Sequence, residues 1–262
     1  ISNDKRCNNT GASDRKIAEN TNLNIERGNK LYKTAVFDGS DLKAVEAFKE
    51  LSVSDLEKIF SKQRISKTIL CSVGGKFEED LVQYLKANTD CYSMDDDLTL
   101  PMSLSYKTPD TLGKDRIASV VGALSCAKGR SVIVIDAGSC LCVDYADGNS
   151  VYRGGSISPG IGMKYKALHT FTANLPLLDL DETNFGFCGS RTDECIHSGV
   201  INGTLFEING FIEKYTENDE TVEVFLTGGY ADFIAGRLNR EVIVDKHIVL
   251  KGLNVILDIN AK

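Results

Sequence analysis

The segment SVIVIDAGSCLCVDYADGNSVYR, residues 131–153, decides the fold. Two mainly apolar stretches, 131–135 and 139–145, precede an Asp147-Gly148 turn and a third extended stretch, 149–153. Short apolar stretches separated by turn residues are typical of strands joined by tight turns. The segment therefore predicts a three-stranded antiparallel meander.

The first half of the chain is predicted to begin in a similar way. Residues 23–25 and 34–37 flank the turn 26–29, where Gly28 favours a hairpin bend. The pattern then predicts a helix over 40–51, a short helix opened by a Ser54/Glu57 capping box, a buried strand over 69–73, and a helix through Phe77, Leu81 and Leu85.

Helices and strands also alternate in the second half. The pattern predicts a helix starting at Asp115, a helix through Tyr165 and Leu168, a long helix from about Thr192, a strand over 222–226, a helix through Phe233 and Leu238, and a final helix over about 250–259. Because both halves begin with hairpins and continue with helices, we predict an α/β protein with a duplicated architecture.

We expect two domains in a chain of 262 residues. Residues 1–22 are almost all polar, and we expect a tail there that is disordered or foreign to the natural chain. The first domain is expected over 23–115 and the second over 116–262, with the final helix packing back on the first domain.

Composition limits the possible partners. The formal net charge is -7, whereas nucleic acids and anionic membranes attract clustered lysine and arginine, so we expect neither as a partner. No apolar run approaches the roughly 18 residues of a membrane span. The eight cysteines show no zinc-like spacing, and we expect reduced thiols in a cytoplasmic protein.

Three glycine-containing segments predict contacts with a phosphate or a nucleotide. They are the turn 26–30, the stretch 154–162 and the junction 225–229. Glycine lets a ligand approach the backbone, and free amide groups attract phosphate oxygens. The same segments also suit a hairpin turn, a flexible connector and a close helix–strand contact, respectively, so each one alone leaves both interpretations open.

Two aspartates are candidates for chemistry. Asp136 follows an apolar strand, where a buried carboxylate needs a cation or amide groups to compensate its charge, so it suits a metal or monovalent cation. An Asx-turn is the alternative. Asp115 lies beside Arg116 at a predicted helix start, where capping of the helix is the alternative to catalysis.

Several long motifs together resemble those of the type III pantothenate kinases. They are Tyr106-x-x-Pro109-x-x-Leu112-Gly113-x-Asp115-Arg116, Asp136-Ala137-Gly138-Ser139, residues 154–160, residues 226–229, residues 171–176 and residues 198–203. The match runs from about Leu23 to the C-terminus. It implies two actin-like (ribonuclease H-like) domains of the acetate and sugar kinase superfamily, with mixed sheets flanked by helices and a nucleotide cleft between them.

The resemblance also implies a reaction. It is the ATP-dependent phosphorylation of pantothenate to 4'-phosphopantothenate, the first step of coenzyme A biosynthesis, by a homodimer in which Asp115 is the general base. The implied pantothenate-binding residues are Tyr106, Gly113, Lys114, Arg116 and, across the dimer interface, Thr172. The implied ATP-binding residues are Glu26, Gly28, Asn29, Lys30, Lys33 and Ser139. Magnesium accompanies ATP, and Asp136 is implied to hold a potassium or ammonium ion.

The first turn departs from the family pattern Asp-x-Gly-Asn-Thr, because Glu26 and Lys30 stand at its first and last positions. Glutamate carries its carboxylate one methylene farther, and a shift of about 1 Å in a positioning group can cost on the order of a hundredfold in rate. Two alternatives therefore stay open: a weakened pseudokinase or regulatory binding protein of the same fold, and a kinase for another small hydroxy acid.

Overall fold

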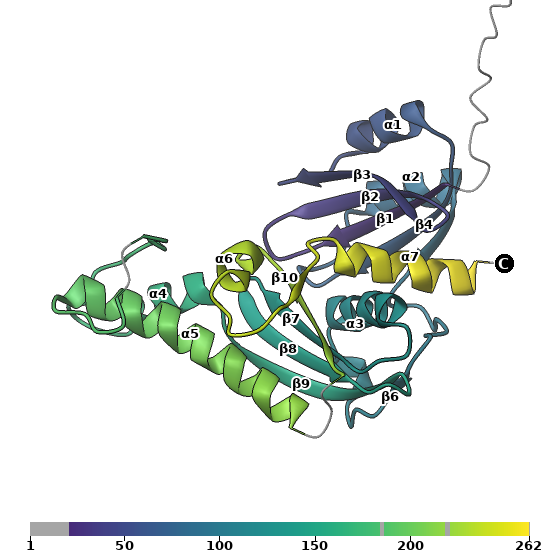
Figure 1. The fold of residues 1–262 in the computed structure, drawn as a ribbon. Helices are drawn as coiled ribbons and strands as arrows, with labels where there is room; N and C mark the ends of the chain where they lie inside the picture. Colours follow the sequence, from purple (N-terminus) through teal and green to yellow (C-terminus); the bar gives the residue numbers. More distant parts are fainter. Residues whose placement is uncertain (1–20, 184–185, 218–220, 262) are drawn as a thin grey trace, which may run out of the picture.

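The computed structural model describes residues 21–183, 186–217 and 221–261, which form two mixed β-sheets with helices packed on them and between them (Figure 1). Residues 1–20 of the expected polar tail lie outside the described residues. Thr21 and Asn22, which the sequence assigned to that tail, already belong to the first strand, β1 (Thr21–Arg27).

The first sheet has the strand order β3-β2-β1-β4-β5. Strands β1, β2 (Tyr32–Asp38) and β3 (Asp41–Phe48) are antiparallel, whereas β4 (Ile65–Ser72) and β5 (Asp90–Ser93) run parallel to β1. Helices α1 (Val53–Lys62) and α2 (Glu79–Asn88) cover one face, where their apolar stripes pack on Leu23 and Ile25 of β1 and on Ile65 and Leu70 of β4. The predicted hairpin, strand and helices of this region are confirmed, except over residues 40–51 and at two ends, because Val73 follows β4 and Phe77 precedes α2.

The second sheet repeats this topology. Strands β7 (Val132–Ala137), β8 (Cys140–Ala146) and β9 (Val151–Pro159) form the predicted antiparallel meander, while β10 (Glu223–Thr227) and β11 (Ile243–Val244) continue from β7 in parallel. The short strand β6 (Ser103–Leu104) adds to β9. One face is covered by α4 (Ile161–Thr170), α5 (Thr192–Thr216) and α6 (Ala231–Ala235).

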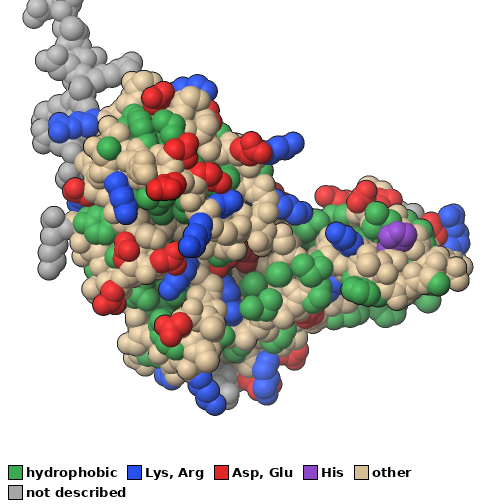
Figure 2. All heavy atoms as spheres, turned by 180° about the vertical axis from the view of Figure 1, so that it is seen from behind, with side chains coloured by type: hydrophobic (Ala, Val, Ile, Leu, Met, Phe, Trp, Pro, Cys, Tyr) green, Lys and Arg blue, Asp and Glu red, His purple; other side chains and the backbone are tan. Residues whose placement is uncertain are grey.

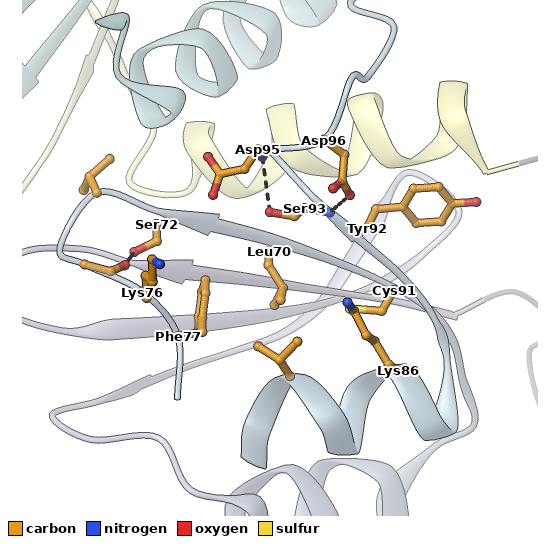
Figure 3. A pocket seen from close by; sticks show the side chains of 13 residues that line it. Leu70, Ser72, Lys76, Phe77, Lys86, Cys91, Tyr92, Ser93, Asp95 and Asp96 are labelled. Atoms are coloured by element: carbon orange, nitrogen blue, oxygen red, sulfur yellow. Dashed lines mark hydrogen bonds between the residues drawn. The ribbon is translucent and has the colours of Figure 1, made fainter. Parts of the chain in front are cut away.

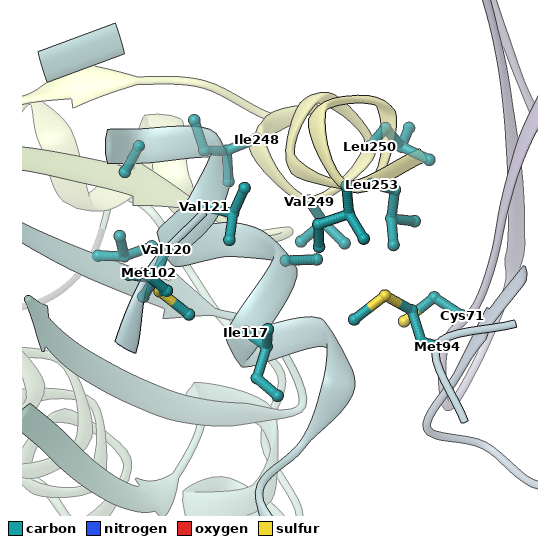
Figure 4. Close-up of a cluster of buried hydrophobic side chains, with 14 of the residues drawn as sticks. Cys71, Met94, Met102, Ile117, Val120, Val121, Ile248, Val249, Leu250 and Leu253 are labelled. Carbon is teal, nitrogen blue, oxygen red and sulfur yellow. The ribbon is translucent and has the colours of Figure 1, made fainter. Parts of the chain in front are cut away.

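Helices α3 (Lys114–Ala127) and α7 (Ile248–Asn260) form the layer between the two sheets (Figure 1). Their apolar side chains make one core with residues from both sheets, seen around Ile117, Met94 and Leu253 in Figure 4. The helices cross at two glycines. A Cβ atom on Gly252 would lie 1.7 Å from the backbone oxygen of Ala118, so no larger residue fits this crossing.

Hydrogen bonds also tie α7 to the first sheet. The side-chain amide of Asn22 donates to Asn254 at 2.9 Å, and that of Asn24 donates to the backbone oxygen of Leu250 at 2.9 Å. Both asparagines of β1 are buried, where such pairing is needed to compensate the lost hydration of the amide groups. The last helix is therefore fastened to β1 at two successive inward positions.

The helix predicted over residues 40–51 is wrong, because the structure has strand β3 there. Leu42 and Val45 are three residues apart, a spacing that suggested one face of a helix. The register of β2 and β3 shifts between Val36 and Phe37, and Leu42 and Val45 both pack against the core between the sheets. A β-bulge places residues of such spacing on one face of a strand.

Two smaller corrections concern helix ends. Helix α1 is opened by a capping box of Ser52 and Asp55, two residues before the predicted pair. The helix predicted through Phe233 and Leu238 is shorter and ends at Ala235. No helix among the described residues is long and apolar enough to cross a membrane.

Candidate active site

Two carboxylates occupy equivalent places in the two sheets. Glu26 is the second-last residue of β1, and Asp136 is the second-last residue of β7, the corresponding strand of the second sheet. A third carboxylate, Asp115, lies in the first turn of α3. The charges of Asp115 and Glu26 both raise the pKa of Asp136, and the charge of Asp115 also raises that of Glu26, so the three carboxylates lie close enough to act on one another.

Asp136 is the least compensated of the three carboxylates. Its Oδ1 atom is buried and has no hydrogen-bond partner among the described residues. Burial, followed by the charges of Asp115 and Glu26, raises its pKa to about 7. A carboxylate oxygen held in this way is suited to bind a cation, which supplies the missing compensation.

Glycines make room around Asp136. A Cβ atom on Gly228 would lie 2.5 Å from Oδ1 of Asp136, and one on Gly138 would lie 3.1 Å from it. Gly228 also has φ +91, a conformation that favours glycine. Close packing thus explains Gly228, whereas a Cβ atom on Gly229 would meet nothing within 4 Å. Of the two glycines in the junction 225–229, Gly229 is therefore the one with free space beside its backbone for a ligand.

Lys33 forms an ion pair with one of these acids. It pairs with Glu26 across β1 and β2, with Nζ 3.4 Å from Oε2. Burial nevertheless raises the pKa of Glu26, although Lys33 opposes this shift. The Lys33 charge also opposes, without cancelling, the rise in the pKa values of Asp115 and Asp136, so one ammonium group acts on all three acids.

Asp115 is half-buried and has a raised pKa. Gly113 lies two residues before it, and a Cβ atom added to Gly113 would lie only 2.6 Å from Oδ1 of Asp115. That oxygen accepts a hydrogen bond from the backbone amide of Arg116 at 2.8 Å. Burial raises the pKa of Asp115 against the lowering effects of this amide and of the Arg116 charge. A raised carboxylate pKa favours proton transfer near neutral pH.

Arg116 is held by a residue that the sequence analysis missed. Its Nε lies 3.1 Å from both carboxylate oxygens of Asp144, and its Nη2 lies 2.6 Å from Oδ1. The hydroxyl of Tyr152 donates to the same Oδ1 at 2.6 Å. The sequence did contain a signal for it, since Asp144 stands between Val143 and Tyr145 in the middle of an apolar strand. A charge buried there needs a partner of opposite charge.

In the glycine-rich stretch 154–162 the structure has the end of strand β9, up to Pro159, and the start of α4, with Gly160 as its N-cap. Gly154 and Gly155 lie inside strand β9. A Cβ atom on Gly155 would meet the backbone oxygen of Val143 at 2.0 Å and Oδ1 of Asp144 at 2.8 Å. Gly154 has φ +108 and lies against the ring of Tyr106. Both glycines therefore serve packing around Asp144 and Tyr106.

The other predicted residues lie around this centre or apart from it. Asn29 and Lys30 are exposed on the β1–β2 turn, where the amide of Gly28 donates to Leu31 at 3.0 Å. Lys114 is half-buried at the start of α3, and Ser139 is half-buried between β7 and β8. The structure thus brings Glu26, Lys33, Asp115 and Asp136 together.

Thr172 lies on a separate surface. It lines a groove of about 720 Å³ between α4 and α5, together with Phe171 and Cys195, and no residue of the carboxylate site lines that groove. Phe171 and Phe206 are 86% and 59% exposed, respectively. Figure 2 shows hydrophobic side chains along the arm that contains these two helices.

Another hollow, of about 630 Å³, lies beside the first sheet, between α2, β5 and the loop after β4 (Figure 3). Leu70 lines it and packs toward α2, whereas the next residue, Cys71, packs into the core with α3. Successive residues of a strand face opposite sides of the sheet. The floor of this hollow is therefore separated by the sheet from the carboxylate site.

Known proteins are similar in sequence to this chain over most of its length. A sequence model of the family described as Type III pantothenate kinase matches residues 20–214. A type III pantothenate kinase of Christiangramia forsetii is 39% identical over 241 residues, covering 91% of this chain and 98% of the relative. One from Bacteroides fragilis is 37% identical, with 91% and 98% covered.

Solved structures agree in fold. A putative Baf family transcriptional activator from Campylobacter jejuni matches with a TM-score of 0.57 at 22% identity, covering 90% of this chain and 97% of that one. A putative 2-dehydro-3-deoxygalactonokinase from Sinorhizobium meliloti gives a TM-score of 0.54 at 13% identity, with 89% and 97% covered. The expected fold class, two actin-like mixed sheets flanked by helices, is confirmed. The extent and identity of the sequence matches show that the chain belongs to the type III pantothenate kinase family.

Proposed function

We propose that the protein transfers the γ-phosphoryl group of ATP to pantothenate and makes 4'-phosphopantothenate for coenzyme A biosynthesis. Family membership supports the substrate pair. The observation that carries the chemistry is the half-buried carboxylate of Asp115 at the start of α3, whose charge acts on Glu26 and Asp136. A kinase needs such a carboxylate beside the groups that bind the triphosphate.

Asp115 is the proposed general base. It accepts the proton of the primary hydroxyl group of pantothenate while that oxygen attacks the γ-phosphorus of ATP. Gly113 keeps space beside its Oδ1, and the raised pKa matches it to proton uptake near neutral pH. Tyr106, Gly113, Lys114 and Arg116 are the proposed pantothenate contacts within the same subunit.

The turn between β1 and β2 is proposed to bind the triphosphate. The contributing residues are Glu26, Gly28, Asn29, Lys30 and Lys33, with Ser139 contributing from the second sheet and Gly229 beside the nucleoside. Magnesium would accompany the phosphates of ATP, held by few protein groups, as is usual for this ion.

Asp136 is the proposed ligand of a monovalent cation, potassium or ammonium. Its buried, unpartnered Oδ1 fits such an ion, which would compensate the charge of the carboxylate. Glu26 and Asp115 add negative charge to the same site. The cation would supply positive charge near the phosphates, while Asp136 itself fixes where that charge is bound.

We further infer a cytoplasmic homodimer. The exposed apolar surface of α4 and α5 supports the dimer, because such patches often mark interfaces between proteins. This surface includes Phe171 beside Thr172. In the dimer, Thr172 would contact pantothenate bound to the partner subunit. We also keep the division into domains over 23–115 and 116–262 as a proposal.

A coupled assay of ADP release, with mass spectrometry of the product, tests the function. We expect pantothenate-dependent ADP release and a product heavier by one phosphate, with activation by potassium or ammonium. Binding of ATP or pantothenate without product would instead favour a regulatory protein. Turnover with another small alcohol, and none with pantothenate, would favour a kinase of different specificity.

A further inference from the structure

We propose that Asp144 and Tyr152 are positioning residues that fix Arg116 and Tyr106 for the acidic end of the substrate. This inference rests on the proposed function, because it assigns a task to two of the proposed pantothenate contacts. Asp144 and Tyr152 come from β8 and β9, whereas Arg116 comes from α3 and Tyr106 from the segment after β6. The network thus joins four separate parts of the chain.

The first argument is the way in which Asp144 binds the guanidinium group. An arginine has five N–H donors arranged on more than one edge of a plane. Asp144 accepts from Nε and Nη2, so it occupies a single edge of Arg116. Among the described residues, Nη1 of Arg116 makes no hydrogen bond. The second edge of the guanidinium group, which Nη1 forms with Nη2, is therefore left for a carboxylate of a ligand.

The second argument is burial. The side chains of Arg116 and Asp144 are 9% and 2% exposed, so water contributes little to holding them. Burial raises the pKa of Asp144, while the Arg116 hydrogen bonds and charge oppose the shift. The charged pair persists there because each partner compensates the other. A guanidinium group fixed in this way loses little further side-chain freedom when it binds an anion.

The third argument is the link to Tyr106. The hydroxyl of Tyr152 donates to Oδ1 of Asp144 at 2.6 Å, and its ring lies against that of Tyr106, with centroids 5.9 Å apart. Gly154 and Gly155 provide the space that Tyr106 and Asp144 occupy. One carboxylate therefore orients Arg116 directly and Tyr106 through an intervening ring.

Asp144→Asn and Tyr152→Phe test this proposal, with Asp147→Asn as the matched control. Asp147 forms an ion pair with Arg153 in the same hairpin, but it lies outside the network. We expect Asp144→Asn to raise KM for pantothenate roughly tenfold or more, as for loss of a charged hydrogen bond, and to change KM for ATP less than about twofold. Tyr152→Phe, which removes only a hydroxyl group, should show the same selective effect at about threefold.

A second readout uses panthenol, which has an alcohol in place of the pantothenate carboxylate. The preference for pantothenate over panthenol should fall in Asp144→Asn and Tyr152→Phe, and should stay unchanged in Asp147→Asn. A lower Tm with an unchanged KM and preference in both network variants would mean that the pair only stabilises the fold, and would overturn the proposal.

The parent protein separates this result from the function itself. If it binds pantothenate by calorimetry but does not phosphorylate it, the proposed reaction is wrong, and the dissociation constants of the three variants decide the positioning role. If the parent neither binds nor phosphorylates pantothenate, both proposals are overturned.

Discussion

Replacing Asp136 with Asn should stabilise the protein, and the gain should grow with pH. Burial and neighbouring acids raise the pKa of Asp136 from 3.8 to about 7. In the unfolded chain the group ionises near its ordinary pKa, so above that pH folding must take up a proton or bury a charge. Stability therefore falls as pH rises through this window and levels off above the folded-state pKa.

The size of this effect follows from the shift. Each pKa unit corresponds to about 1.4 kcal/mol, so between pH 4.5 and pH 8 the penalty on the parent grows by roughly 3 kcal/mol. The amide group that Asp136→Asn introduces adds a contribution that does not depend on pH. The difference in unfolding free energy between variant and parent should therefore widen by roughly this amount over the same range.

Urea unfolding at both pH values, without potassium, ammonium or ATP, measures the difference. Asp179→Asn is the control, because Asp179 is an exposed carboxylate outside the site. A gap between Asp136→Asn and parent that stays constant within about 0.5 kcal/mol, or narrows as pH rises, would refute the conclusion that Asp136 is an uncompensated buried acid.

Three further outcomes are expected. Asp115→Asn should lower turnover at least about a hundredfold with an unchanged circular dichroism spectrum, and turnover within a few fold of the parent would contradict its role as base. Gly252→Ala should lower the unfolding free energy by about 2 kcal/mol or more in urea, because the new methyl group meets the Ala118 backbone; unchanged stability would contradict the tight crossing. Glu26→Asp combined with Lys30→Thr should lower KM for ATP in steady-state kinetics, and no change or a rise would count against the interpretation of that turn.

The strands that carry the carboxylates could be predicted because local signals agreed there. Residues 131–153 combine apolar stretches with an Asp-Gly turn, and the structure has the meander β7–β9 at that place. Strand β3 could not be predicted in the same way. Its bulge near Lys43 gave Leu42 and Val45 a helix-like spacing, and pairing with β2 decided the outcome. The Gly39-Ser40 turn, with Gly39 at φ +58, was the overlooked signal for a hairpin.

The sequence pointed to the acids of the candidate site more clearly than to the residues that hold its other members in place. Asp115 and Asp136 stood out because each begins or ends an apolar element, where a carboxylate is costly. Asp144 lies within a strand, and its partner Arg116 is 28 residues away, so only the folded chain reveals the pair. The purpose of Gly155 likewise depends on its contact with a neighbouring strand.

The close crossing of α3 and α7 at Gly122 and Gly252 also affects how far apart the acids of the site are held. Gly122 lies seven residues after Asp115, about 10 Å along the same helix, and α7 is in turn fastened to β1, the strand that ends near Glu26. The spacing between Asp115 and Glu26, on the two sides of the proposed site, is thus set by a backbone contact between α3 and α7. Substitutions at this joint should change catalysis without touching any substrate.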